Sequence, residues 1–255
     1  MIGVVASAAL GFAAGLFLNV VIDWVPRKGQ RLRPPRFRCP RCPLLEKPRP
    51  GWPVTAWLRP GAACPVCGRS LPNRYWLVPV ATAALFGAGA ARFGADWALP
   101  AYFVFLASLV AITVIDYQLQ IIPNRIVYPT IFVAVPLLAV AAAASGDWGA
   151  LGRALIGASA AWLALFAIHL VSPGGMGFGD VRLSFILGLF LGWLSYSHVF
   201  VGMFLGFMLG AVVGGGLVLF RVRSRADHVP FGPFLAAGAI LGVLFGNALV
   251  RSWLG

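Results

Sequence analysis

Long, uncharged and apolar stretches recur along almost the whole chain. The stretches are Ile2–Ile22, Tyr75–Ala91, Trp97–Ile115, Ile126–Gly146, Ala154–Gly179, Leu183–Phe220 and Val229–Val250. A helix needs about 20 apolar residues to cross a bilayer, and roughly 17–25 are tolerated, so all but Leu183–Phe220 fit one crossing each. That stretch has polar residues near its centre, at 195–198, and fits two crossings joined by a tight turn. The pattern therefore predicts about eight transmembrane helices.

The composition agrees with a membrane protein. Of the 255 residues, 60% are hydrophobic and 11% are charged, whereas a soluble domain is about 45–50% apolar and roughly 25% charged. These values argue against a soluble enzyme, a disordered chain and a nucleic-acid-binding globule. Because a segment in lipid must satisfy its own backbone hydrogen bonds, the expected fold is an all-α polytopic membrane protein.

The basic residues fall mostly on one side of this predicted topology. With the N-terminus outside, the cytoplasmic segments hold 17 of the 20 Lys and Arg residues, and the outer segments hold Arg92, Arg153 and Arg251. Cytoplasmic loops carry the excess of Lys and Arg in membrane proteins. We therefore expect both termini outside and the segment after the first helix at the cytoplasmic face. The net charge of +13 then predicts contact of the basic residues with anionic lipid headgroups and not with nucleic acid.

The apolar pattern breaks for about fifty residues after the first predicted helix. Residues 1–25 form that helix, residues 26–74 are rich in Pro, Arg and Cys, and residues 75–255 form a seven-helix membrane domain. The middle segment is too small to build a core unaided. It therefore needs a covalent or metal cross-link.

All four cysteines of the chain lie in this segment, in two Cys-x-x-Cys pairs: Cys39, Cys42, Cys64 and Cys67. This spacing is typical of a tetrahedral Cys₄ zinc site. The alternative is two disulfide bonds, which the predicted cytoplasmic location disfavours because thiols there stay reduced. A closed Cys₄ shell leaves no open coordination position, so the predicted zinc is structural.

Glycines recur at four-residue spacing in the last third of the chain. One set is Gly202, Gly206, Gly210 and Gly214, and the other is Gly238, Gly242 and Gly246. Small residues at this spacing let transmembrane helices approach closely. The pattern favours helix packing; a gate or a sliding surface for substrate is the alternative.

Only seven residues are acidic, so their positions are informative. We expect Asp96 and Asp147 to be solvated in outer loops, and Asp23 and Asp227 to be paired with basic neighbours or solvated. Glu46 belongs to the cysteine segment. The remaining two, Asp116 and Asp180, close the third predicted helix and follow the fifth.

Asp116 and Asp180 reach the same predicted membrane boundary. Acids at membrane depth are costly and usually functional. Two carboxyl groups that meet cannot both ionise, so one can act as a general base on water while the other polarises a peptide carbonyl. The glycines before Asp180 let the backbone bend and approach a peptide closely. From the acids alone, an aspartic protease and an ion- or proton-coupled transporter remain equal alternatives, and a zinc-bearing scaffold is a third.

Several motifs, in order, resemble those of the type IV prepilin peptidase family of Gly-x-Gly-Asp membrane aspartic proteases. They are Gly15–Ile22, the two Cys-x-x-Cys pairs, Arg74–Val78, Asp116 with Ile122-Pro123-Asn124, Gly177–Leu183 and Pro230–Leu235. The likeness runs nearly the whole length of the chain. It implies Asp116 and Asp180 as the catalytic pair and zinc on the four cysteines.

The resemblance also implies a reaction. Family members remove the basic leader from prepilins or pseudopilins on the cytoplasmic side of the inner membrane, before a hydrophobic helix. Many members then methylate the new N-terminal amine with S-adenosylmethionine. The substrate could serve pilus assembly, secretion or competence.

The sequence departs from the family pattern in three places. Residues 23–26 read Asp-Trp-Val-Pro where Tyr-Arg-Leu-Pro is usual, Pro79 replaces a Glu, and Arg182 replaces a Lys with its charge kept. The first two departures remove charged side chains from the region linked to methylation. The peptidase prediction is unaffected by them, whereas the methyltransferase prediction is weakened, and the sequence identifies no S-adenosylmethionine-binding residue.

Overall fold

The computed structural model describes residues 1–26, 73–171, 176–220 and 230–254, and these ranges are helical almost throughout. The helices are α1 (Ile2–Trp24), α2 (Arg74–Phe93), α3 (Leu99–Leu119), α4 (Asn124–Ser145), α5 (Trp148–Val171), α6 (Phe178–Leu194), α7 (Tyr196–Leu219) and α8 (Gly232–Leu254). The prediction of an all-α fold is confirmed.

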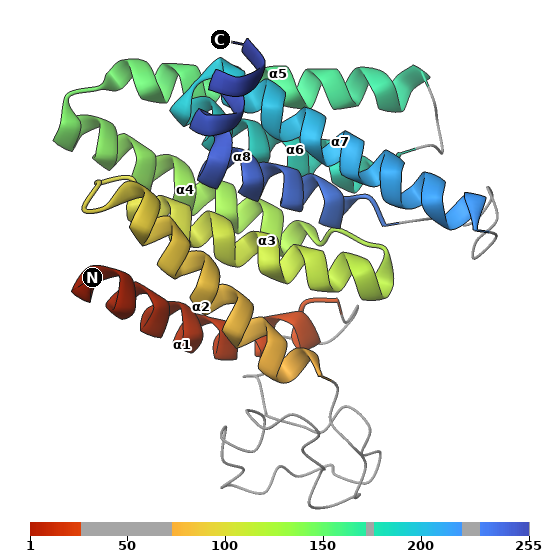
Figure 1. The fold of residues 1–255 in the computed structure, drawn as a ribbon, viewed down its shortest axis with the longest axis horizontal. Helices are drawn as coiled ribbons and strands as arrows, with labels where there is room; N and C mark the ends of the chain where they lie inside the picture. Colours follow the sequence, from red (N-terminus) through yellow and green to blue (C-terminus); the bar gives the residue numbers. More distant parts are fainter. Residues whose placement is uncertain (27–72, 172–175, 221–229, 255) are drawn as a thin grey trace, which may run out of the picture.

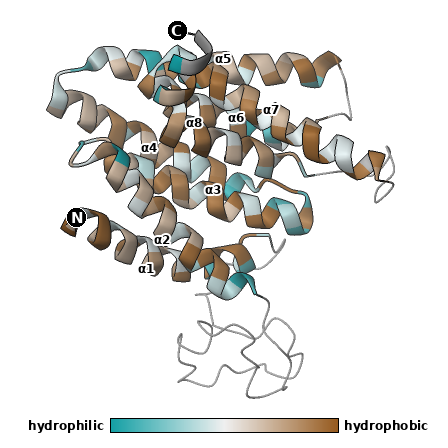
Figure 2. Ribbon diagram, in the orientation of Figure 1, coloured by the Kyte–Doolittle hydropathy of each residue, from teal (hydrophilic) through white to brown (hydrophobic). Residues whose placement is uncertain are grey.

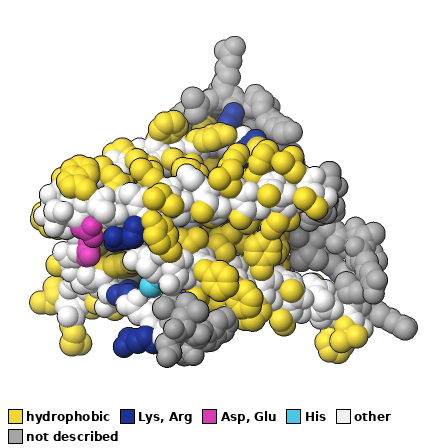
Figure 3. Space-filling model, turned by 90° about the horizontal axis from the view of Figure 1, so that it is seen from above, with side chains coloured by type: hydrophobic (Ala, Val, Ile, Leu, Met, Phe, Trp, Pro, Cys, Tyr) yellow, Lys and Arg dark blue, Asp and Glu magenta, His cyan; other side chains and the backbone are white. Residues whose placement is uncertain are grey.

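Seven of these eight helices are long and apolar enough to cross a membrane. The exception, α6, has 17 residues and falls just short in length. Apolar residues run along the helices, and hydrophilic residues gather near helix ends (Figure 2). On the face seen in Figure 3, hydrophobic side chains are spread across the coloured surface and charged side chains are few. The chain is therefore a multi-pass membrane protein.

The helix ends differ from the predicted ones where a charged residue lies inside a helix. The fifth predicted stretch, 154–179, is in fact α5 ending at Val171 followed by the start of α6 at Phe178. Arg153 lies within α5 and pairs with Asp147, 3.5 Å away. The sequence Pro173-Gly174-Gly175, three poor helix formers, follows α5. Counting uncharged residues therefore misplaced both ends of this helix.

The helices pack as antiparallel pairs around a central pair. Hairpins α1–α2, α5–α6 and α7–α8 have the closest pairings, and α3 and α4 lie between the first hairpin and the other two (Figure 1). The two most buried helices are α3 and α6. They meet through aromatic residues: the Tyr102 hydroxyl donates to the Phe190 carbonyl at 2.8 Å, and the Phe105 ring stacks on that of Phe190.

Glycines permit the close approach within the hairpins. A methyl group on Gly157 of α5 would lie 2.8 Å from the Gly188 carbonyl oxygen of α6, so the two backbones are in direct contact. Gly202 and Gly206 of α7 meet Gly238 of α8 in the same way. The packing interpretation of the glycine spacing is confirmed at these positions, whereas a methyl group on Gly214 would meet no atom of the described residues within 4 Å.

Candidate active site

Asp116 lies in the last turn of α3 and is buried, with 5% of its surface exposed. Its Oδ2 accepts a hydrogen bond from the backbone N–H of Gly232, the first residue of α8, at 3.0 Å. A methyl group at position 232 would lie 2.7 Å from the same oxygen, so only glycine fits without a shift. The start of α8 thus fixes the carboxyl group of Asp116.

Asp180 is the third residue of α6 and is also buried, with 7% exposed. Gly177 precedes the helix as its N-cap, and its backbone makes a hydrogen bond to the Asp180 carboxyl group. The first turn of a helix stabilises an acid through its unpaired N–H groups. The other oxygen, Oδ1, is buried and has no hydrogen-bond partner among the residues that the structure describes.

The structure brings the two acids together at one end of the bundle. The end of α3 meets the starts of α6 and α8, and the two carboxyl groups are close enough for their charges to interact. Ile122, between α3 and α4, contacts both Gly179 and Gly232: a methyl group on Gly179 would lie 2.9 Å from its Cβ. Gly179 is therefore required by the packing of Ile122, a role different from the predicted approach of a peptide.

Neither acid has a cation partner among the residues that the structure describes. Within the described ranges, the ion pairs join Arg74 to Asp23 and Arg153 to Asp147. Two buried carboxyl groups without a counter-charge favour a state that carries one shared proton. Such a pair supplies a general acid and a general base at the same place. These are the two groups needed for water to attack the carbonyl carbon of an amide.

Two residues of the quoted motifs meet between α4 and α6. Arg182 of α6 donates to the Asn124 side-chain oxygen at 2.5 Å, and its guanidinium lies 4.5 Å from the centre of the Phe178 ring. Asn124 begins α4, directly after Ile122 and Pro123. The Ile-Pro-Asn motif and the Gly-x-Gly-Asp motif are thus joined by side-chain contacts.

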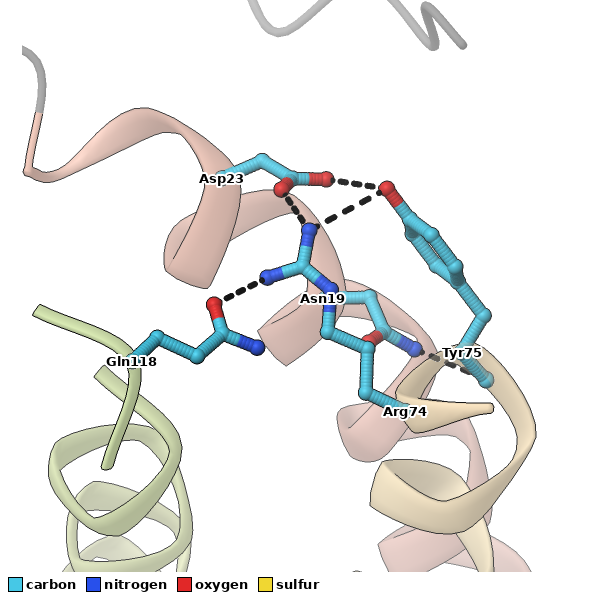
Figure 4. Close-up of polar contacts among 5 residues, drawn as sticks. All are labelled: Asn19, Asp23, Arg74, Tyr75 and Gln118. Carbon is cyan, nitrogen blue, oxygen red and sulfur yellow. Dashed lines mark hydrogen bonds and ion pairs between the residues drawn. The ribbon is translucent and has the colours of Figure 1, made fainter. Parts of the chain in front are cut away.

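The third acid in the membrane-boundary region, Asp23, has a different environment. Arg74 forms an ion pair with it, and the Tyr75 hydroxyl donates to its Oδ2 at 2.7 Å (Figure 4). Arg74 also donates to the Gln118 side chain at 3.0 Å, and Asn19 donates to the Tyr75 carbonyl oxygen at 2.9 Å. This Asp23–Arg74 cluster joins α1, α2 and α3, and the expected pairing of Asp23 is confirmed.

Pro79, which stands where the family has Glu, is buried in the α1–α2 hairpin. It packs directly against Gly15 of the opening motif, and Gly11 packs one turn further along against the Thr82 carbonyl. The position therefore serves helix contact in this chain and offers no carboxyl group.

The predicted zinc ligands Cys39, Cys42, Cys64 and Cys67, with Glu46 and Asp227, lie outside the described residues. Within the described part of the chain, no group of three or more His, Cys, Asp or Glu is placed to hold a metal ion. The zinc site accordingly stays a prediction.

The fold and the site together define the class: a polytopic helical membrane protein with two buried acids close together where α3 ends and α6 begins. Residues 103–220 match the Type IV leader peptidase family, and residues 9–93 match the Bacterial Peptidase A24 N-terminal domain. The first range holds both aspartates, and the second includes all four cysteines.

Curated relatives match nearly end to end. Three are named prepilin leader peptidase/N-methyltransferase: one from Bacillus subtilis, 33% identical over 86% of this chain and 86% of its own length; one from Aeromonas salmonicida, 31% over 94% and 90%; and one from Pseudomonas aeruginosa, 29% over 98% and 93%. The chain belongs to the type IV leader peptidase family. The predicted family is confirmed, and the transporter alternative has no support. No solved structure matches the chain.

Sequence reasoning missed the backbone donor of Gly232, the packing of Ile122 and the roles of Asn19 and Gln118. Gly232 lies in Pro230–Leu235 and Asn19 in Gly15–Ile22, so the motifs flagged both regions. A backbone N–H carries no signal in sequence, however, and the contact joins residues 116 positions apart. Gln118 lies outside every quoted motif.

Proposed function

We propose that this chain is a membrane aspartic endopeptidase that removes the basic leader from type IV prepilins or pseudopilins, with Asp116 and Asp180 as its catalytic pair. The observation that carries the proposal is the convergence of these two buried, unneutralised carboxyl groups where α3 ends and α6 begins. Family membership supplies the substrate class, because the full-length relatives are named for prepilin leaders.

In the proposed reaction the two carboxyl groups share one proton. The ionised carboxylate takes a proton from water as the water oxygen attacks the scissile carbonyl carbon, and the protonated carboxyl gives its proton to the carbonyl oxygen. The resulting tetrahedral intermediate then collapses: the carbon–nitrogen bond breaks, and the leaving amine receives the proton that the first carboxylate took up. One hydroxyl group of the intermediate gives its proton to the second carboxylate as the carbonyl of the new carboxyl terminus forms. Water adds across the peptide bond, and the pair regains its single proton.

The surrounding groups hold this geometry. Gly232 donates to Asp116 and Gly177 hydrogen-bonds Asp180, so each carboxyl group is oriented by backbone. The Asp180 Oδ1 atom, which has no partner among the described residues, is the atom suited to bind water or the scissile carbonyl. Ile122 holds α6 and α8 beside each other.

We infer that all eight helices cross the inner membrane, α6 included. Its 17 residues rise about 26 Å at about 1.5 Å each, near the roughly 30 Å of a bilayer core. The uneven distribution of Lys and Arg places both termini outside and the acid pair at the cytoplasmic face. Residues 1–25, 26–74 and 75–255 are then the first helix, a cytoplasmic domain and the peptidase domain.

The same proposal assigns structural zinc to the cytoplasmic segment. Four thiolates in two Cys-x-x-Cys pairs form a donor set that suits tetrahedral Zn²⁺, and Cys39, Cys42, Cys64 and Cys67 would hold it. The polybasic character of the segment suits contact with anionic lipid and not with nucleic acid.

A second activity, N-methylation of the new N-terminus with S-adenosylmethionine, is favoured by the names of the relatives. Two features weaken it for this chain. Asp23 is engaged by Arg74 and Tyr75, and Pro79 packs against Gly15 where the family has an acid. No residue is assigned here to the methyl donor.

One incubation tests both activities. Membranes containing the full chain are mixed with a full-length prepilin, with and without S-adenosylmethionine, and the N-terminus of the product is read by mass spectrometry. We expect loss of the leader in both samples and a further methyl group only with the cofactor. An intact prepilin, in the presence of folded enzyme, would contradict the peptidase proposal; cleavage without methylation would contradict only the second.

A further inference from the structure

A laterally open groove of about 640 Å³ lies between α4, α5 and α6. Apolar and aromatic side chains make up most of its lining, including Tyr128 of α4, Trp162 of α5 and Phe178 of α6. Leu163, also in the lining, is 58% exposed, so the groove opens on the outer surface of the bundle. On a membrane protein, this surface faces lipid.

The groove lies on the opposite side of α6 from the candidate active site. Phe178, Arg182 and Phe185 line it and are spaced i, i+4 and i+7, so they share one face of the helix. Asp180 lies two residues from both Phe178 and Arg182, or about 200° around the helix at roughly 100° per residue. Its carboxyl group interacts with Asp116 of α3, so a molecule in the groove is separated from the acid pair by α6.

Among the described residues that line the groove, Arg182 is the cation. Its charge has no carboxylate partner among the residues that the structure describes, where the ion pairs involve Arg74 and Arg153. The guanidinium is held in place by Asn124 and by the Phe178 ring. A planar, pre-positioned guanidinium is suited to a phosphate group, which it can bind through two parallel hydrogen bonds.

We propose that this groove binds one anionic phospholipid, with an acyl chain along the apolar lining and the phosphate on Arg182. The positive charge of Arg182 favours a negatively charged headgroup. Because the groove opens on the lipid-facing surface, a lipid can enter it directly from the bilayer. Ser159, the lining hydroxyl of α5, donates to the Leu155 carbonyl of its own helix, which leaves Arg182 to recognise the headgroup. The proposal does not depend on the peptidase activity.

The test counts phospholipids retained by the purified full-length protein. Native mass spectrometry is recorded in detergent micelles with added phosphatidylglycerol or phosphatidylcholine. We expect preferential retention of phosphatidylglycerol, with Arg182→Gln weakening it about tenfold, as for loss of a charge-assisted hydrogen bond, and leaving phosphatidylcholine unchanged. Arg182→Lys keeps the charge and is expected to restore most of the retention.

Two matched pairs of variants separate this site from the general surface. Ser159→Phe fills the groove and is expected to reduce retention, whereas Ile156→Phe, on the exposed surface of the same helix outside the lining, is not. Arg125→Gln removes a neighbouring cation and is also expected to have no effect.

Three results would overturn the proposal. The first is unchanged phosphatidylglycerol retention in Arg182→Gln. The second is an equal loss in Arg125→Gln, which shows diffuse attraction to a basic surface. The third is unchanged lipid retention in Ser159→Phe with a raised KM for prepilin, which assigns the groove to the apolar segment of the substrate. Because lipid retention is measured without substrate, a failure of the peptidase proposal can produce neither the first nor the second of these results.

Discussion

The molecule holds acids in two environments, one with a partner cation and one without, and the contrast between them separates a structural role from a chemical one. Asp23 is matched by a guanidinium and a phenol, from Arg74 and Tyr75, in a cluster that joins three helices. Asp116 and Asp180 are close enough for their charges to interact, and each is hydrogen-bonded by backbone, with no cation partner among the described residues. A neutralised acid stabilises the hairpin that carries it, whereas an unneutralised pair retains a mobile proton. Perturbed acids of the second kind cluster at functional sites.

The largest expected effect distinguishes these two environments directly. Asp116→Asn and Asp180→Asn each remove a group that transfers a proton, so cleavage of a prepilin should fall by about 10³-fold or more. Asp23→Asn alters only the α1–α2–α3 contacts and should cost less than about tenfold. Initial rates for the three purified variants, at equal amounts of folded protein, provide the measurement. A greater loss in Asp23→Asn than in Asp180→Asn would reverse the assignment.

The next effect concerns how the pair is held. Gly232→Ala would place a methyl group 2.7 Å from Asp116 Oδ2 and displace that carboxyl group, and a misplacement near 1 Å can cost about 10²-fold in rate. We expect kcat to fall with little change in the thermal unfolding midpoint. Gly214→Ala is the matched control, because no atom of the described residues lies within 4 Å of the added methyl group, and it should cleave normally. Normal cleavage by Gly232→Ala would exclude this contact from the site.

A smaller effect measures the Asp23–Arg74 cluster as a stabilising unit. Arg74→Gln leaves the partly buried Asp23 carboxylate without its cation and should lower the free energy of unfolding by about 1.5–3 kcal/mol. The double variant with Asp23→Asn should lose less than the sum of the two single variants, since each removes the same interaction. Reversible unfolding in detergent supplies the four values of the cycle. Strict additivity would show that the two side chains do not stabilise the fold as a pair.

The smallest effect is expected at the exposed pair of Asp147 and Arg153. Their side chains are 54% and 37% exposed and 3.5 Å apart, and such pairs contribute about 0–1 kcal/mol because water screens them. Asp147→Asn should therefore change neither the unfolding midpoint nor cleavage measurably. A loss as large as that of Arg74→Gln would mean that exposure does not explain the difference between the two ion pairs.

The helices could be predicted from the apolar pattern because lipid allows few alternatives to a spanning helix. The ends of α5 and α6 could not, since charged residues such as Arg153 and Asp180 lie inside helices, where a count of uncharged residues stops too early. The same count ended the third uncharged stretch at Ile115, whereas α3 continues past Asp116 to Leu119.

The acid pair itself could be predicted from spacing, topology and motif resemblance, because both residues lie at the same predicted boundary. The contacts that hold the two carboxyl groups in place could not be predicted from the sequence. The bond from Gly232 to Asp116 and the packing of Ile122 on Gly179 depend on how three helix ends meet. The groove beside Arg182 could not be predicted from the sequence either, because it depends on the spacing of three helices and not on any motif.

The central claim is that Asp116 and Asp180 act as one unit. It is tested most directly by the cleavage rates of Asp116→Asn, Asp180→Asn and the double variant, measured side by side on one prepilin. Residues that act as a unit give strongly non-additive losses, so we predict that the double variant is no slower than either single variant. Substantial cleavage by either single variant, or a double variant slower by the product of the two single losses, would contradict the account.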